Sequence, residues 1–582
     1  MTAVDGRQAG TADSTLSTIR ARIRNSSNQP WNSRTETRQL LILVCFLLVF
    51  LVVAGRIAMI IWSSPADNGS TYKPSYWSDR VPIVDRNGIT LAVNLPTDAL
   101  YAHPREMTDP GKAAEGLARI FSDLDADELE ERFNRQRAFL WIKRKITPEQ
   151  KQAVQNIGTT GLHFGPRKSR TYPNGKLAAH LLGGTTYGGE AVSSAEVVGI
   201  AGVEQAMNEY LSNPTAEGTP LRLSIDVRLQ YLIEQKLADA IRAFEAKRGT
   251  VILMNIHNGE ILALASEPDF DPNDRPVFTG ANAADASPLF FDPVQGVFEL
   301  GSVFKVFPVA QALDEGLPDS RGQPYTQDSA VSNKSFKISG YKISGTENLG
   351  DDITLREVIT RSSNAGAARI ALKLGADRQR EFLSRLGFLE PTSVQLAEGS
   401  LGSPLWPKRW KQLETATIAF GHGLAVSPLH LAAGYAALVN GGYRVHPTIL
   451  TTDADEEKGP RVISEATSAE MVDMLRAVVT EGTASQAKSA FYAIGGKTGT
   501  ANKPNPGRGY HKDKVIATFA SVFPADEPRY VLIVSLNEAT SNDGTRWENS
   551  AGKTAVPTAL VIISEIAPML GIRPQVAMGS GR

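Results

Sequence analysis

The sequence predicts an α+β protein with a single N-terminal transmembrane helix. Its 582 residues are too many for one hydrophobic core, so several domains are expected. Residues 39–62 form one long apolar segment. Strand-like patterns lie at both ends of residues 221–571, with helical patterns between them, which predicts an antiparallel sheet flanked by helices and closed by returning C-terminal strands.

The composition is that of an ordinary globular protein. Hydrophobic residues make up 42% of the chain, charged residues 21%, and the net charge is -1, so no basic excess points to nucleic acid as a partner. The only cysteine, Cys45, lies in an apolar stretch, which leaves neither a disulfide framework nor a cysteine metal site. We expect no metal and no cofactor.

The first 78 residues predict a tail, an anchor and a linker. Residues 1–38 are polar and arginine-rich, typical of a disordered tail. Residues 39–62 are long enough for one transmembrane helix, since about 20 residues span a bilayer. Arginines crowd the N-terminal flank, which places the tail in the cytoplasm and the rest of the chain outside. A cleaved signal peptide is disfavoured by the long polar region and the lack of a clear cleavage site. Residues 63–78, rich in Pro, Gly and Ser, read as a linker.

Residues 79–220 are expected to form an N-terminal domain. Asn87-Gly88 between two short apolar runs predicts a hairpin. Residues 110–160 combine charge with helical periodicity and predict two or three surface helices. His180, beside alanines, is expected to be a buried structural histidine.

Residues 221–571 are expected to form the second domain, with a short tail at 572–582. A type I′ turn at His257-Asn258-Gly259-Glu260 should join its first two sheet strands. The predicted strands are residues 221–226, 249–256, 261–266, 493–500, 515–523 and 530–537. The predicted helices are residues 229–244, 355–374, 415–440 and 555–569, in addition to the helix that follows Ser302.

Ser302 and Lys305 are the first candidate catalytic pair. They lie three residues apart at the start of an apolar helical run, so the lysine can reach the serine hydroxyl. The same spacing recurs elsewhere and is weak evidence alone, but Ser362-Ser363-Asn364 and Lys497-Thr498-Gly499-Thr500 follow in order. SxxK, SxN and KTG in this order are the signature of serine acyl-transferases of the penicillin-binding and β-lactamase kind. A phosphate-binding loop around Lys497 is excluded because Phe491 stands where its first glycine is needed.

This chemistry predicts a role for each motif. Ser302 would attack an acyl carbon, and Lys305 would accept its proton if burial and the charge of Lys497 lower the lysine pKa. Ser362 would relay a proton to the leaving amine, and the Asn364 amide would hold Lys305 or the substrate.

The KTG strand and the nucleophile's backbone are expected to bind the substrate. Lys497 would bind a carboxylate, and the backbone N–H groups of Ser302 and Thr500 would form an oxyanion hole worth about 3 kcal/mol per donor. The glycine of the motif would let the substrate backbone approach closely. The predicted substrate-binding residues are Ser363, Thr498, Gly499 and Thr500.

The sequence resembles the class B penicillin-binding proteins, most closely the septal transpeptidases of FtsI type. Besides the three motifs, the resemblance rests on Asp85-Arg86-Asn87-Gly88, Arg170-x-Tyr-Pro, Gly202-Val203-Glu204 and Phe420-Gly-His-Gly-Leu. Leu300 and Val306 stand where these enzymes commonly have proline, which bears on local helix geometry rather than on reacting atoms.

The resemblance implies an elongated, partner-binding N-terminal pedestal and a C-terminal serine transpeptidase domain. It further implies cross-linking of peptidoglycan stem peptides ending in D-Ala-D-Ala, acylation of Ser302 by β-lactam antibiotics, and division partners such as FtsW, FtsN and FtsQLB. The catalytic domain would then be periplasmic, anchored in the inner membrane at the septum. The alternatives are an elongation-specific class B transpeptidase, a β-lactamase or β-lactam sensor, and a non-catalytic division scaffold, against which the intact motifs argue.

Overall fold

The computed structural model describes most of the chain after residue 79. The described residues are 44, 46–54, 56, 80–135, 137–187, 197–213, 219–277, 287–452, 458–505, 507, 509–542 and 547–575. The chain divides into two compact units, Met1–Pro74 and Ser75–Arg582. The tail predicted at 1–38 lies outside the described residues, as do most of the segment predicted to cross a membrane and the whole of the linker predicted at 63–78. In the part that is described, no helix has both the length and the apolar character to span a bilayer.

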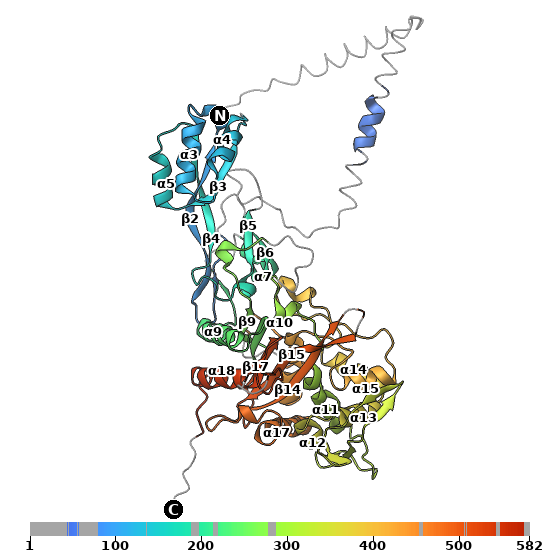
Figure 1. The fold of residues 1–582 in the computed structure, drawn as a ribbon. Helices are drawn as coiled ribbons and strands as arrows, with labels where there is room; N and C mark the ends of the chain where they lie inside the picture. Colours follow the sequence, from blue (N-terminus) through green and yellow to red (C-terminus); the bar gives the residue numbers. More distant parts are fainter. Residues whose placement is uncertain are drawn as a thin grey trace, which may run out of the picture. The chain divides into compact units, whose positions relative to one another are not determined.

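The second unit begins with a sheet in which one long strand pairs on both sides. This central strand, β2 (Thr90–Ala102), pairs antiparallel with β1 (Ile83–Val84), β3 (Leu140–Ile146) and β4 (Leu162–Thr171) along different parts of its length (Figure 1). The predicted hairpin at Asn87-Gly88 is therefore confirmed, and Gly88 supplies its left-handed residue with φ +86°. Strand β7 (Leu221–Arg222) joins the same sheet by pairing parallel with β1.

Three helices cover the outer part of this sheet and form a small core of their own. They are α3 (Pro110–Ile120), α4 (Ala126–Asn134) and α5 (Pro148–Gln155). Their apolar faces bury Leu117 and Phe133 against Leu100 of β2. The expectation of two or three helices holds, but it missed β3, whose charged outer residues hide the alternation of a half-buried strand. We call this outer part, residues 98–164, the head.

Two of the motifs behind the family resemblance meet in a buried ion cluster. Arg80 and Arg170 each place their Nε 2.6 Å from the Glu204 carboxylate, and all three side chains are buried. Removing one partner would leave an uncompensated buried charge, so the cluster fixes β4 to the short helix α7 (Gly202–Ala206). His180 is likewise structural: it is buried, it contacts the Pro288 carbonyl, and burial lowers its pKa to about 4.

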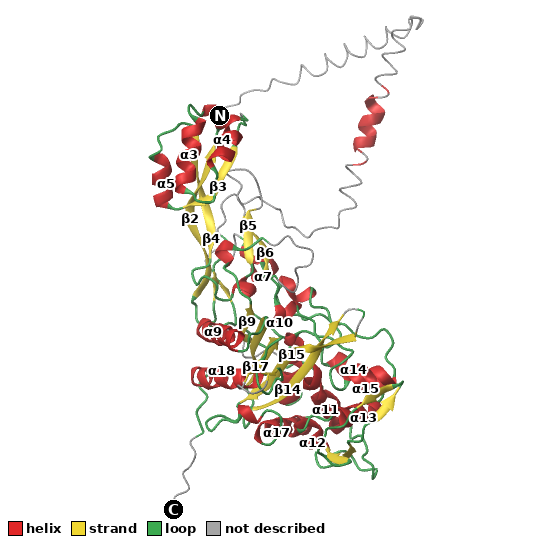
Figure 2. Cartoon of the chain, in the orientation of Figure 1, coloured by secondary structure: helices red, strands yellow, loops and turns green. Residues whose placement is uncertain are grey.

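The sheet of the C-terminal part has the strand order β14-β15-β16-β8-β9 and is antiparallel throughout. Figure 2 labels three of these strands, β14, β15 and β9. The returning C-terminal strands thus close the sheet against the first hairpin, as predicted. The strands are β8 (Arg248–Asn255), β9 (Ile261–Glu267), β14 (Gly495–Asn505), β15 (Gly509–Phe523) and β16 (Tyr530–Asn537).

Helices cover both faces of this sheet. As a result, every residue from 530 to 536 in the central strand β16 is buried. Helices α9 (Val227–Ala243) and α18 (Ala555–Met569) pack together against it, and α16 (Pro428–Val439) and α17 (Glu465–Thr480) also contact its strands.

The predicted hairpin between β8 and β9 is confirmed, but the prediction that its turn is of type I′ is wrong. Only Gly259 has a positive φ, whereas type I′ requires it at both central residues.

Two helices predicted as continuous are each broken in the structure. Residues 355–374 form α12 (Leu355–Thr360) and α13 (Asn364–Leu374), because Ser362 is left-handed at φ +61° and Ser363 caps the second helix. Residues 415–440 are divided between α15 (Gln412–Ile418) and α16 by a loop with two left-handed glycines, and α16 starts at its own capping serine. Both breaks bring loops toward Ser302.

Candidate active site

Ser302 lies in a 3₁₀ turn, Gly301–Lys305, that leads directly into helix α11 (Val306–Asp314). The turn packs against edge strand β14, and Gly499 makes this close approach possible. A Cβ on Gly499 would lie 2.5 Å from the Leu300 carbonyl oxygen and 3.2 Å from the Val303 nitrogen. We predicted that this glycine makes room for substrate, but its closest neighbours are the residues flanking Ser302. Gly499 therefore sets the position of the nucleophile relative to the strand.

Lys305 is fully buried and directed at two hydroxyl groups. Its Nζ donates to Ser302 Oγ at 2.9 Å, to Ser362 Oγ at 2.9 Å and to the Ser362 carbonyl, which uses all three ammonium hydrogens. Burial is the main cause that lowers the Lys305 pKa well below its usual value, and the charge of Lys497 lowers it further. Lys305 thus lies where a neutral amine could take the Ser302 proton.

Ser362 lies between the two lysines. Its Oγ is 2.9 Å from Lys305 Nζ and 3.1 Å from Lys497 Nζ, and its left-handed backbone at the break between α12 and α13 places it there. Lys497 is also fully buried, and burial lowers its pKa to about 7. Within the described residues, neither lysine has a carboxylate partner, so an incoming anion would meet an unpaired cation.

The structure does not bring every predicted residue into contact with this cluster. Ser363 is fully buried; its hydroxyl donates to Asn333 and accepts from the N–H of Gly366, which makes it a helix cap rather than a group facing substrate. Asn364 is exposed at the first turn of α13, and its amide forms no hydrogen bond to Lys305 among the residues described.

Both threonines of the KTG strand have partners in the protein. Thr498 Oγ1 lies 2.8 Å from Thr483 Oγ1, and the Thr500 hydroxyl accepts from the Ala551 N–H at 3.1 Å. The sequence offered no signal for Thr483 or Ala551, because both come from segments that reach the strand only in the folded chain.

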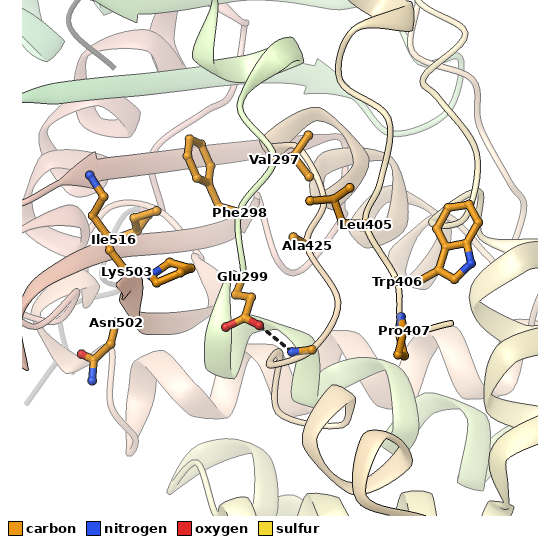
Figure 3. Close-up of a pocket in the computed structure, with 12 residues that line it drawn as sticks. Val297, Phe298, Glu299, Leu405, Trp406, Pro407, Ala425, Asn502, Lys503 and Ile516 are labelled. Atoms are coloured by element: carbon orange, nitrogen blue, oxygen red, sulfur yellow. Dashed lines mark hydrogen bonds between the residues drawn. The ribbon is translucent and has the colours of Figure 1, made fainter. Parts of the chain in front are cut away.

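A cavity of about 360 Å³ adjoins the nucleophile's turn (Figure 3). Its lining includes Phe298, Glu299, Trp406 and Asn502. Glu299 precedes Ser302 by three residues, and its carboxylate accepts from the N–H of Gly423 at 2.7 Å, drawn as the dashed line in Figure 3. Asn502 follows Thr500 by two residues on β14, so the cavity extends the site along the strand. Glu299 was not among the predicted site residues, although it lies beside the serine motif.

Comparison with known proteins decides the family. Residues 249–563, more than half of the chain, match the family model described as the penicillin binding protein transpeptidase domain. The chain belongs to the penicillin-binding protein transpeptidases. Residues 77–216 of this penicillin-binding protein match a second model, the penicillin-binding protein dimerisation domain, and the pair of domains is that of class B.

Relatives of this penicillin-binding protein match along most of its length. It is 35% identical over 526 residues to the probable peptidoglycan D,D-transpeptidase FtsI of Caulobacter vibrioides, covering 88% of this chain and 85% of the relative. The Escherichia coli peptidoglycan D,D-transpeptidase FtsI is 28% identical, with 91% of each chain covered. The crystal structure of penicillin binding protein 3 from Mycobacterium tuberculosis, complexed with aztreonam, shares its fold with a TM-score of 0.62. That comparison is at 24% identity and covers 86% of this chain and 98% of the other.

Proposed function

We propose that this protein is the peptidoglycan D,D-transpeptidase that cross-links stem peptides during septal wall synthesis, through an acyl-enzyme on Ser302. The observation that carries the proposal is the buried Lys305, whose Nζ lies 2.9 Å from both Ser302 Oγ and Ser362 Oγ. Burial lowers the Lys305 pKa well below its usual value. Burial of an unpaired lysine is unfavourable for folding, and a site for proton transfer explains why it is kept.

Acylation is the first half of the reaction. Neutral Lys305 takes the Ser302 proton as Oγ attacks the carbonyl carbon of the penultimate D-Ala. The backbone N–H groups of Ser302 and Thr500 hold the oxyanion that develops. When the tetrahedral intermediate collapses, the C–N bond breaks, and Ser362 passes the proton from Lys305 to the leaving nitrogen. D-Ala departs, and the rest of the stem peptide remains bound to Ser302 as an ester.

Deacylation runs the same proton path in the opposite direction. The amine of a neighbouring stem peptide attacks the ester carbon and loses a proton through Ser362 to Lys305. Lys305 then returns a proton to Ser302 Oγ as the ester bond breaks. One new amide bond forms for each D-Ala released, so the cross-link needs no cofactor or outside energy source.

Lys497 is proposed to bind the terminal carboxylate of the donor peptide. Its pKa of about 7 leaves it partly neutral when the site is empty, and an arriving carboxylate would favour the charged form. Thr498 and Thr500 add hydroxyl groups beside it, and the exposed Asn364 amide would bind the peptide backbone. Ser363, by contrast, supports this site only by capping α13.

The same attack explains β-lactam inhibition: Ser302 opens the strained lactam amide, and the acyl group stays on the enzyme. The Mycobacterium tuberculosis relative in complex with aztreonam is consistent with this expectation.

The division role is supported by the relatives named FtsI. We accordingly propose an N-terminal cytoplasmic tail at 1–38, a membrane helix at 39–62, a linker at 63–78, a partner-binding domain at 79–220, a transpeptidase domain at 221–571 and a short tail at 572–582. FtsW, FtsN and FtsQLB would be its partners at the septum of the inner membrane, with the catalytic domain in the periplasm.

Labelling with a fluorescent penicillin tests the proposal. Full-length protein in membranes should be labelled on the peptide containing Ser302, and Ser302→Ala should abolish the label. Ser485→Ala is the matched control, because Ser485 also precedes a lysine by three residues but lies exposed in another turn. Incubation with pentapeptide strands should release D-Ala and form cross-linked dimers. Rapid turnover of the penicillin without D-Ala release would instead identify a β-lactamase.

A further inference from the structure

Two histidines and a glutamate converge on the surface of the head, in a different domain from Ser302. His103 follows β2, Glu106 ends the 3₁₀ turn Pro104–Glu106, and His163 lies near the start of β4. His103 Nδ1 lies 3.0 Å from one carboxylate oxygen of Glu106, and His163 Nε2 lies 2.8 Å from the other. Each of the three residues offers one candidate ligand atom, and these three atoms all lie within 4.8 Å of one another. Among the residues described, no other group of three His, Cys, Asp or Glu side chains is this close together.

The backbone holds these residues in place independently of their side chains. His163 is paired with Tyr101 across β2 and β4, and the His103 N–H donates to the Gly161 carbonyl at 2.8 Å. The Thr160 hydroxyl donates to the carbonyl of Glu106 at 2.8 Å. The turn that carries Glu106 is therefore tied to the start of β4 at two points.

An aromatic wall orients the two imidazoles. The Tyr101 ring stacks on His163 with a centroid distance of 5.6 Å and an angle of 21°, and it contacts His103 at 5.4 Å. Phe139 packs against both Tyr101 and His103. Each ring thereby directs a nitrogen at Glu106, an arrangement that reduces the entropy lost when a ligand set closes on an ion.

We propose that His103, Glu106 and His163 bind a divalent transition-metal ion of the Zn²⁺ class. Two imidazole nitrogens and one carboxylate oxygen are a ligand set that Zn²⁺ prefers, whereas Mg²⁺ and Ca²⁺ take oxygen ligands almost exclusively. With metal–ligand bonds near 2.0 Å, tetrahedral ligands lie about 3.3 Å apart, close to the nitrogen–oxygen distances now spanned by hydrogen bonds. Small rotations of the two imidazole rings would bring the three ligand atoms around an ion. The ion would then take the place of the hydrogen-bonding protons between the imidazoles and the Glu106 carboxylate.

The fourth coordination position would be open. Glu106 is exposed and both imidazoles are half-buried, so water or a side chain of a partner protein could complete the sphere. The ion would join the end of β2 to the start of β4 and so stabilise the head. The sequence carries no recognisable metal motif because His163 lies 57 residues beyond Glu106.

Zinc binding by the full-length protein in detergent, carrying no histidine tag, tests this proposal. Titration with Zn²⁺ against a chromogenic chelator should give one site per chain, and Co²⁺ should give the visible absorption of a low-coordinate site with nitrogen ligands. Glu106→Gln and His163→Gln should each weaken Zn²⁺ binding by at least about 10-fold, since loss even of outer-shell partners has that effect. Zn²⁺ should also raise the melting temperature of the wild type but not of these variants.

His257→Gln is the matched control, because this histidine lies on the β8–β9 hairpin outside the cluster, and it should bind Zn²⁺ as the wild type does. Penicillin acylation should proceed normally in all three variants, which separates this proposal from the transpeptidase function. Without Zn²⁺, the three variants should keep the circular dichroism spectrum and melting temperature of the wild type, which shows that the head is folded. The proposal is overturned if the wild type takes up no stoichiometric Zn²⁺, or if Glu106→Gln and His163→Gln bind it as tightly as the wild type.

Discussion

Replacing Lys497 with methionine should make the protein more stable and less active. Burial lowers the Lys497 pKa from 10.5 to about 7, so the folded protein holds this proton less tightly than the unfolded chain does. At 1.36 kcal/mol per pKa unit, the buried lysine destabilises the fold at pH 7 by on the order of 4 kcal/mol. This penalty is fully present below pH 7 and disappears as the pH rises through 10.5. Methionine has similar length and no charge, so Lys497→Met should recover much of the penalty, less the lost hydrogen bond to Ser362.

Denaturant unfolding of the full-length protein at pH 6, 7 and 9 measures this gain, with Lys488→Met at an exposed lysine as the control. The gain should be largest at pH 6 and should shrink at pH 9. Acylation by a penicillin should be slower at neutral pH, because removing the Lys497 charge raises the Lys305 pKa and leaves less neutral base. A variant that is no more stable than the wild type at pH 6 would refute the reasoning, since it would mean that the Lys497 cation is not penalised by burial.

Three further predictions follow from the geometry. Gly499→Ala should destabilise the fold by about 1–3 kcal/mol and slow acylation by about 10²-fold, because its Cβ would displace the turn of Ser302. Gly350→Ala is the control and should be neutral, since its Cβ meets only one atom, at 3.6 Å. Equal acylation rates in the two variants would contradict this account. Ser363→Ala should lower the free energy of unfolding by about 1–2 kcal/mol through loss of the α13 cap but keep acylation, and a folded variant that cannot be acylated would restore its predicted contact with substrate. The kcat/KM for carboxylate-bearing substrates should rise as Lys305 loses its proton and fall above about pH 7 as Lys497 loses its charge, so a profile still rising at pH 9 would exclude the proposed role of Lys497.

Most of the sheet could be predicted from the sequence because its strands carry strong local signals. The apolar runs of β15 and β16 are nearly continuous, as expected for strands covered on both faces. The helix predicted at residues 555–569 has the same two ends as α18 in the structure. Strand β3 was missed because its run of Lys143, Arg144 and Lys145 resembles the charged surface of a helix. The hairpin at Gly259 was predicted but its turn type was not, since Asn-Gly also fits turns with a single left-handed residue.

The candidate site was found through three motifs whose order is informative even though each is weak. Periodicity did not indicate that the helix predicted at 355–374 breaks at Ser362, because a positive φ at a serine is imposed by tertiary contacts rather than by local preference. The same limit explains the position of Ser363. Its place in the motif suggested substrate binding, whereas its buried bond to Asn333 depends on a segment 30 residues away. Glu106 and His163 are likewise brought together only by the pairing of β2 with β4.

The acylation rate of Lys305→Arg tests most directly whether a buried neutral lysine is the general base. Arginine keeps the charge and approximate reach but stays protonated at any accessible pH, so it cannot take the Ser302 proton. Mass spectrometry of the penicillin adduct over time, with a thermal melt to confirm folding, should show acylation slowed by a factor on the order of 10² to 10⁴. Near wild-type acylation by a folded Lys305→Arg protein would contradict the assignment and move the search for the base to Ser362 or a bound water.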